Sequence, residues 1–154
     1  MSRLLTRGII QQVINSSGGG DVTPDAVNWD NISNTIEGRS TIYIVNKQQI
    51  TGITETITLS ATWPSSPPPP IIIYYRVDST NPAWSNGGSY NGSTSGWTSI
   101  SSGTEFTVVN GDYVSFFCEL DGPSVSITIT ITNITDSNTV LDTFNATTST
   151  LAPL

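Results

Sequence analysis

The stretch ITETITLSATW, at residues 53–63, alternates apolar side chains with threonine and serine. A second stretch, VSITITIT at residues 125–132, repeats this pattern. Successive side chains of a β-strand point to opposite faces, so a period of two residues predicts a strand with one buried face. Both stretches are therefore predicted to be strands that turn isoleucine, leucine and valine toward a core.

Five further segments are short, rich in β-branched and aromatic residues, and bounded by turn residues. They are TIYIVN (41–46), IIIYYRVD (71–78), TEFTVV (104–109), DYVSFFCEL (112–120) and TVLDTFNAT (139–147). The Asn-Gly pair at 110–111 predicts a hairpin between the segments 104–109 and 112–120. About seven short strands without a helix between them predict an all-β fold, namely an antiparallel immunoglobulin-like β-sandwich.

The alternation within each strand also predicts which side chains meet in the core. Cys118 belongs to this set and is the only cysteine, so no disulfide forms within the chain and the thiol is expected to pack as a small hydrophobe. The predicted core consists of Ile57, Leu59, Ala61, Ile73, Tyr75, Phe106, Val108, Val114, Phe116, Cys118, Ile127, Ile129 and Phe144.

The first twenty residues, MSRLLTRGIIQQVINSSGGG, carry two arginines and no acid, whereas the whole chain has a net charge of −7. Their apolar spacing is partly helical, but Gly8 weakens a helix by roughly 1 kcal/mol and so short a helix is unstable alone. We predict an extended or partly helical arm that orders only against a partner. The residues assigned to this assembly arm are Arg3, Leu4, Leu5, Arg7, Ile9, Ile10, Val13 and Ile14.

Changes in composition divide the chain into four parts. Residues 1–20 are the basic anchoring arm, which ends in a flexible glycine-rich hinge. Residues 21–40 are a polar connector, residues 41–150 the β-sandwich domain, and residues 151–154 a C-terminal tail.

The composition disfavours chemistry at a catalytic or metal site. The chain has no histidine, which removes Ser–His and Cys–His nucleophiles and every histidine-containing metal site. The acids, such as Glu119 and Asp121, lie near turns without the signature of an apolar pocket, so solvated carboxylates are the better interpretation. The sequence therefore predicts a non-enzymatic protein without catalytic residues, metal or cofactor.

Charge and hydropathy also limit the partners and the location. A net charge of −7 disfavours nucleic acid, because phosphates require lysine and arginine. The longest apolar run, IIIYY at 71–75, is too short to cross a membrane. The N-terminal stretch is interrupted by polar residues and lacks a signal-peptide cleavage site, so synthesis in a cytoplasm is expected.

The segment 81–97 is the candidate recognition loop. Trp84, Tyr90 and Trp97 lie there among asparagine, glycine and serine, a composition that resembles antibody paratope loops. The aromatic rings serve either to contact another protein, to stack on a sugar, or to fold inward and cap the domain. These three interpretations stay open at the level of the sequence.

The strings QQITGITETITLSATW (48–63), FTVVNGDYVSFF (106–117) and SITITITNITDSNTVLDTFNA (126–146) resemble the immunoglobulin-like β-domains of tailed-bacteriophage virion proteins. The likeness covers roughly residues 28–147 and rests on the succession of strand and turn segments. The resemblance implies a structural or adhesive role on a phage particle, assembled in the host cytoplasm.

Together these observations favour a capsid cement or decoration protein that binds the shell through its arm. Its expected partners are the major capsid protein or another virion protein, together with further copies of itself. The alternatives are a tail, neck or baseplate component, or a module that binds a host-surface glycan. An enzyme would instead need two facing carboxylates in a cleft.

Overall fold

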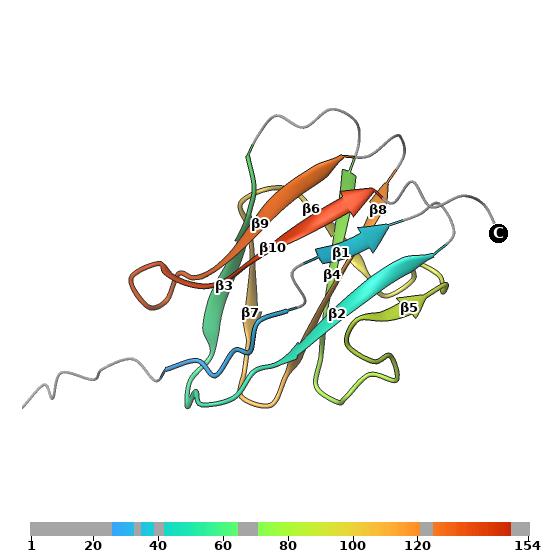
Figure 1. The fold of residues 1–154 in the computed structure, drawn as a ribbon. Coiled ribbons are helices and arrows are strands. Elements are labelled where there is room, and N and C mark those ends of the chain that lie inside the picture. The colour runs from blue at the N-terminus through green and yellow to red at the C-terminus, as the bar shows by residue number, and fades with distance from the viewer. Residues whose placement is uncertain (1–25, 33–34, 39–41, 65–70, 121–124, 149–154) are drawn as a thin grey trace, which may run out of the picture.

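The computed structural model describes residues 26–32, 35–38, 42–64, 71–120 and 125–148, and these residues form strands without helices (Figure 1). The all-β prediction is therefore confirmed. The strands are β1 (Thr35–Gly38), β2 (Tyr43–Gln49), β3 (Ile57–Thr62), β4 (Ile71–Asp78), β5 (Gly88–Tyr90), β6 (Thr98–Ile100), β7 (Thr104–Val108), β8 (Tyr113–Leu120), β9 (Ser126–Asn133) and β10 (Thr139–Thr148).

The ten strands form one mixed sheet in the order β6-β4-β8-β2-β1-β10-β9-β3-β7, with β5 paired to β2. Strand β2 joins the strands β6-β4-β8 to the strands β1-β10-β9-β3-β7. Its first part pairs with β1 and β5, and its second part pairs with β8. The outermost strands β6 and β7 are joined by residues 101–103, so the sheet curls into a nearly closed barrel (Figure 1).

The sheet differs from the predicted immunoglobulin-like sandwich in strand number and direction. The sequence predicts about seven antiparallel strands from their periodicity. The structure adds β1, β5 and β6, and β1 runs parallel to β10. These strands have three or four residues each, which is too short to establish a period of two. Strand β1 also lies inside the span 21–40 that the sequence assigns to a connector.

The predicted hairpin between residues 104–109 and 112–120 is wrong. Strand β7 pairs with β3, whereas β8 pairs with β4 and β2. The turn itself forms, since the Asp112 N–H donates to the Val109 carbonyl at 3.1 Å and Gly111 has a φ of +96°. Phe106 and Phe116 face the same core from opposite walls, so the connection arches over the core.

The main core lies inside the barrel and agrees closely with the prediction. Every predicted core residue except Tyr75 is buried, and Tyr75 packs half-buried against the same cluster. The Cys118 thiol donates to the Ile36 carbonyl at 3.5 Å. Burial raises the pKa of this thiol to about 12, so it stays protonated at neutral pH. The core also contains Ile53 and Ile131, which lie on the apolar faces of the stretches 53–63 and 125–132, and Ile32 of the connector. The core residues that the prediction missed are Ile36, Ile50, Ile100 and Ala146.

A buried carboxylate fixes the start of the described chain to the barrel. Asp142 Oδ2 accepts hydrogen bonds from the Ile32 N–H at 2.8 Å and from the Trp29 indole at 3.3 Å. A register irregularity between Val140 and Asp142 accompanies this arrangement on β10. The segment that enters the sheet is therefore held by one side chain more than one hundred residues away.

Candidate interaction surface

A second hydrophobic cluster covers the outer face of β2, β4 and β8. Phe116 and Phe117 are neighbours on β8, and strand alternation turns Phe116 into the barrel and Phe117 out of it. Phe117 is nevertheless fully buried, because the segment 81–97 folds over it. We call this set the outer aromatic cluster: Tyr43, Val45, Tyr74, Trp84, Tyr90, Trp97 and Phe117.

The rings of the outer aromatic cluster pack against one another around Phe117. The Trp97 and Phe117 centroids are 4.4 Å apart at an interplanar angle of 73°, and Tyr74 stacks on Phe117 at 4.7 Å. Trp84 meets Tyr90 edge-to-face at 5.6 Å and 69°. The three loop rings are therefore not coplanar and do not form one flat platform. Such offset and T-shaped pairs each stabilise by about 0.5–1.5 kcal/mol beyond their buried area.

Lys47 of β2 holds the loop onto this face. Its ammonium donates to Asn81 Oδ1 at 2.7 Å, to the Pro82 carbonyl at 3.2 Å and to the Trp84 carbonyl at 2.7 Å. Three oxygen acceptors match the three donors of an ammonium group. The Lys47 backbone N–H adds a bond to Asn86 Oδ1 at 3.0 Å. One cation thus fixes the path of the loop at its start.

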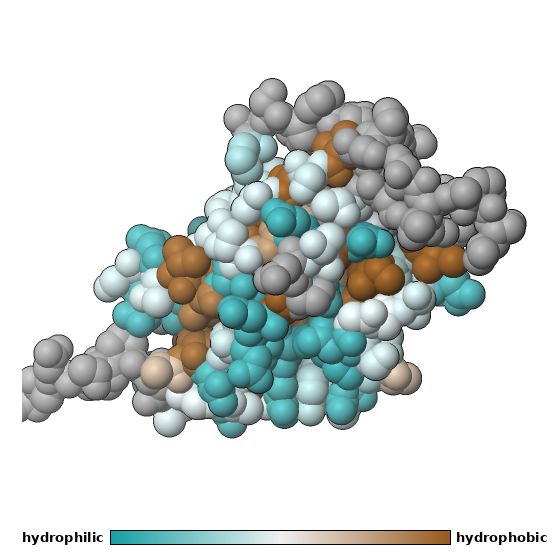
Figure 2. Space-filling model, viewed as in Figure 1, coloured by the Kyte–Doolittle hydropathy of each residue, from teal (hydrophilic) through white to brown (hydrophobic). Residues whose placement is uncertain are grey.

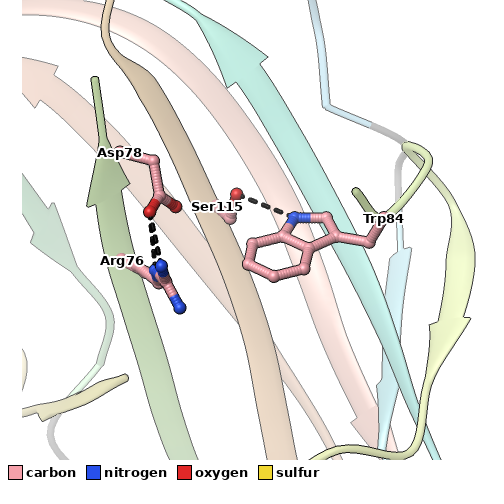
Figure 3. Close-up of polar contacts among 4 residues, drawn as sticks. All are labelled: Arg76, Asp78, Trp84 and Ser115. Carbon is pink, nitrogen blue, oxygen red and sulfur yellow. Dashed lines mark hydrogen bonds and ion pairs between the residues drawn. The ribbon is translucent and has the colours of Figure 1, made fainter. Parts of the chain in front are cut away.

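Arg76 of β4 supports the loop from the neighbouring strand. Figure 3 shows its guanidinium pointing at Asp78 on the same strand, at 2.7 Å from Oδ1. The Arg76 guanidinium also lies 5.5 Å from the Trp84 ring centroid, within the range of a cation–π contact. The Trp84 indole N–H donates to Ser115 Oγ at 3.1 Å (Figure 3). In the part of the chain that the structure describes, Lys47 and Arg76 are the cationic side chains, and both serve this loop.

Tyr74 adds a polar contact at the edge of the outer aromatic cluster. Its hydroxyl donates to Glu119 Oε2 at 2.8 Å. Burial, followed by this hydrogen bond to a carboxylate, raises the pKa of Tyr74 to about 12. The Trp97 indole nitrogen, by contrast, is buried without a hydrogen-bond partner among the described residues.

A groove opens beside the cluster, where the barrel does not close. It has a volume of about 890 Å³ and lies between the end of β4 and strand β7. The Tyr75 and Phe106 rings, with centroids 4.7 Å apart, join its two sides. Asp78 and Glu105 contribute carboxylates to the lining. We call this feature the edge groove.

The rest of the described surface carries hydrophobic side chains only in separate places. The large exposed ones are Ile72, Val109 and Val140, which lie on different segments. Figure 2 shows one face of the molecule, on which brown patches are set apart by white and teal. Scattered apolar residues of this kind are normal on a soluble surface. The loop and the edge groove are therefore the features that call for an explanation.

The structure brings the predicted loop residues together but does not place the arm. Trp84, Tyr90 and Trp97 meet on the outer face of the sheet, where Trp97 is 8% exposed and the other two are half-buried. The assembly arm, Arg3 to Ile14, lies outside the described residues. Sequence reasoning missed Lys47 and Phe117. Their partners lie 20 or more residues away in the chain, so no local pattern marks them.

In comparisons with known proteins, no protein family matches this chain, and neither a curated protein nor a solved structure resembles it. None of the residues described by the structure belongs to a helix long and apolar enough to cross a membrane. Among the same residues, no group of three or more acidic or cysteine side chains is placed to hold a metal ion.

Proposed function

We propose that this chain is a non-enzymatic structural protein of a bacteriophage particle, specifically a capsid cement or decoration protein. The arm at residues 1–20 attaches it to the major capsid protein or to another virion protein. The β-domain, in this proposal a divergent immunoglobulin-like domain, is displayed outward. The resemblance of residues 48–63, 106–117 and 126–146 to virion domains supports this assignment.

The observation that carries the proposal is the separation of charge. Lys47 and Arg76, the cations of the described domain, are both engaged in holding the domain's own loop. The arm, by contrast, contains Arg3 and Arg7 and no acid. An acidic domain with a basic arm is suited to attachment at an acidic surface, where arginine makes bidentate contacts with carboxylates.

Deletion of residues 1–20 tests the attachment role. The truncated chain is expected to stay soluble and folded, because the described core begins after this segment, and to be lost from the particle. A matched control changes Ser16 and Ser17 to glycine, which keeps the arm and its hinge. Incorporation of the truncated chain at the level of the control would contradict the proposal.

A host-surface glycan is the second candidate ligand, within a tail or adhesion role. The observation that favours it is the partial exposure of Trp84 and Tyr90, since aromatic rings stack on sugars. Changing Trp84 and Tyr90 together to alanine, which leaves the buried Trp97 in place, separates the candidates. Weaker self-association or particle stability supports the structural role, and a loss confined to host adsorption supports the glycan.

A further inference from the structure

The edge groove is the place where the sheet lacks a strand. Strand β6 pairs with Ile73–Tyr75 of β4 and goes no further, while β4 continues through Arg76–Asp78. Strand β7 is the other end of the sheet and pairs only with β3. Within the described residues, two strand edges without a partner therefore flank the groove. Unpaired edges of this kind are templates for an added strand.

The chain itself explains why this position is empty. Thr98 pairs with Tyr75, so a longer β6 would place residues 95–97 beside Arg76–Asp78. Trp97 instead turns into the outer aromatic cluster, and Gly96 adopts a φ of +83° that allows the chain to leave. A Cβ atom at position 96 would lie 3.1 Å from Arg76 Nη1, so the turn is also close-packed. Because Trp97 is buried in the outer aromatic cluster, the position beside Arg76–Asp78, in line with β6, is left without a paired strand among the described residues.

We propose that the edge groove receives an extended part of the assembly arm, residues 1–20, from a second copy of the chain. The incoming segment adds as a strand at this position, beside β7, and links neighbouring copies in the assembled array. This inference rests on the proposed assembly role of the arm. It assigns that role a receiving site on the domain.

The charge of the groove favours this occupant. Asp78 and Glu105 bring two carboxylates to the lining, and Arg76 offsets one of them. Asp78 Oδ2 is buried and has no hydrogen-bond partner among the described residues. The first twenty residues carry two cations, Arg3 and Arg7, and no acid. An arginine from the arm supplies a donor for Asp78 Oδ2 and a second positive charge to balance the two carboxylates.

The shape and the length of the chain agree with the same occupant. A short strand of about five residues spans roughly 17 Å, which suits the position beside a five-residue β7. Ile9, Ile10 and Val13 are β-branched and favour an extended backbone. Residues 1–25 span about 80–90 Å when fully extended. A segment of this length is long enough to extend beyond its own domain to a second copy.

Disulfide trapping tests the contact directly. Full-length chains with Thr107→Cys are mixed with full-length chains with Ile9→Cys, in the presence of oxidised glutathione. Native Cys118 is fully buried and does not compete. A disulfide-linked dimer of the two variants is expected. Thr143→Cys, at an exposed position on β10 and outside the groove lining, is the matched control and should give none.

Two outcomes of trapping would overturn the proposal. One is a dimer yield with Thr143→Cys equal to that with Thr107→Cys, which would mean random collision. The other comes from a chain carrying Thr107→Cys and Ile9→Cys together. If that chain forms only an internal disulfide and the mixed variants form none, the arm occupies its own groove and the second copy is excluded.

A charge exchange provides an independent measurement that leaves the core intact. Glu105→Lys in the groove and Arg3→Glu with Arg7→Glu in the arm should each raise the self-dissociation constant about two- to fivefold, the range of exposed ion pairs. The combined variant should regain most of the affinity. Glu55→Lys makes the same charge change at an exposed position outside the groove lining and should have little effect.

The groove contact and the virion role can be contradicted independently of each other. If the exchanged variants show no rescue and trapping gives no dimer, while deletion of residues 1–20 still removes the chain from particles, the groove assignment is wrong and the virion role stands. If the full-length chain is absent from particles, the virion role is wrong, whatever the groove binds.

Discussion

The main core and the outer aromatic cluster lie back to back on strand β8, where Phe116 belongs to one and Phe117 to the other. The main core is largely aliphatic and is enclosed by the strands of the sheet itself. The outer aromatic cluster consists almost entirely of aromatic rings and is enclosed by a loop. The same strand therefore supports two clusters that are closed by different means.

This comparison shows that the outer face of a sheet can be buried by a loop, without a second sheet. The strands that enclose the main core are held edge to edge by ladder hydrogen bonds between their backbones. The loop has few ladder bonds, apart from the three-residue β5, and depends on Lys47, Arg76 and ring packing instead. We expect the main core to govern global unfolding and the outer cluster to govern local opening.

Phe116→Ala should produce the largest effect. It removes a fully buried ring at the centre of the main core, where Phe106 and Phe144 are its aromatic neighbours. The free energy of unfolding should fall by about 3–5 kcal/mol, as measured by urea denaturation. An unchanged unfolding midpoint would show that Phe116 does not face the structural core.

Phe117→Ala should cost less, about 2–3 kcal/mol, because a loop can settle into the space more easily than a closed sheet can. The loss should come with a red shift of tryptophan emission, since Trp97 packs directly on Phe117. The expected difference between the two clusters would be contradicted if this variant lost as much stability as Phe116→Ala and left the tryptophan emission unchanged.

Lys47→Met should release the loop while leaving the barrel folded. Three charge-assisted hydrogen bonds are lost, so local opening should become easier by about 1–3 kcal/mol. Hydrogen exchange in residues 81–90 measures this directly, and exchange in β9 serves as the internal reference. Arg76→Met should accelerate exchange less, because the Arg76 side chain is 35% exposed and its ion pair is screened by solvent. Equal protection in all three proteins would contradict the role of Lys47.

The effect that is absent at neutral pH appears in alkaline solution, and it distinguishes the two clusters by titration. In the folded state, burial holds the pKa of Cys118 at about 12. An unfolded thiol titrates near 8.5. The stability contributed by the neutral thiol is therefore complete below about pH 8.5 and is lost as the pH rises toward 12.

Cys118→Ala should accordingly flatten the decline of stability between about pH 8.5 and 10. Tyr74→Phe tests the outer cluster in the same way, since the pKa of Tyr74 is also raised to about 12. Its effect should begin at a higher pH, because an unfolded tyrosine titrates near 10. A pH profile of Cys118→Ala that is parallel to that of the native protein would contradict the buried neutral thiol.

The main core was largely predictable from the sequence because alternation decides which face is buried. Twelve of the thirteen predicted core residues are buried, which is enough to orient β3, β4 and β7–β10, whereas β2 contributes no residue to the predicted list. Which strands pair with one another was harder to predict from the sequence. Asn110 and Gly111 form the expected turn, but which strands a turn joins depends on whether the flanking side chains face one core from the same wall or from opposite walls.

The outer cluster could be anticipated only in part. Trp84, Tyr90 and Trp97 were identified as a group by composition, but their burial depends on Phe117 and Lys47, which are distant in the chain. The edge groove had no sequence signal at all. It arises because Trp97 leaves the line of β6, which is a consequence of packing on the opposite face of β4.

The central claim is that the domain is displayed on a phage particle. Immunogold labelling of intact particles purified from a culture that expresses the chain, with an antibody against residues 81–97, tests it most directly. The proposal predicts regularly spaced label on the capsid surface, with label lost from particles assembled with the chain lacking residues 1–20. Intact particles that carry no label and contain no copies of the chain by mass spectrometry would contradict it.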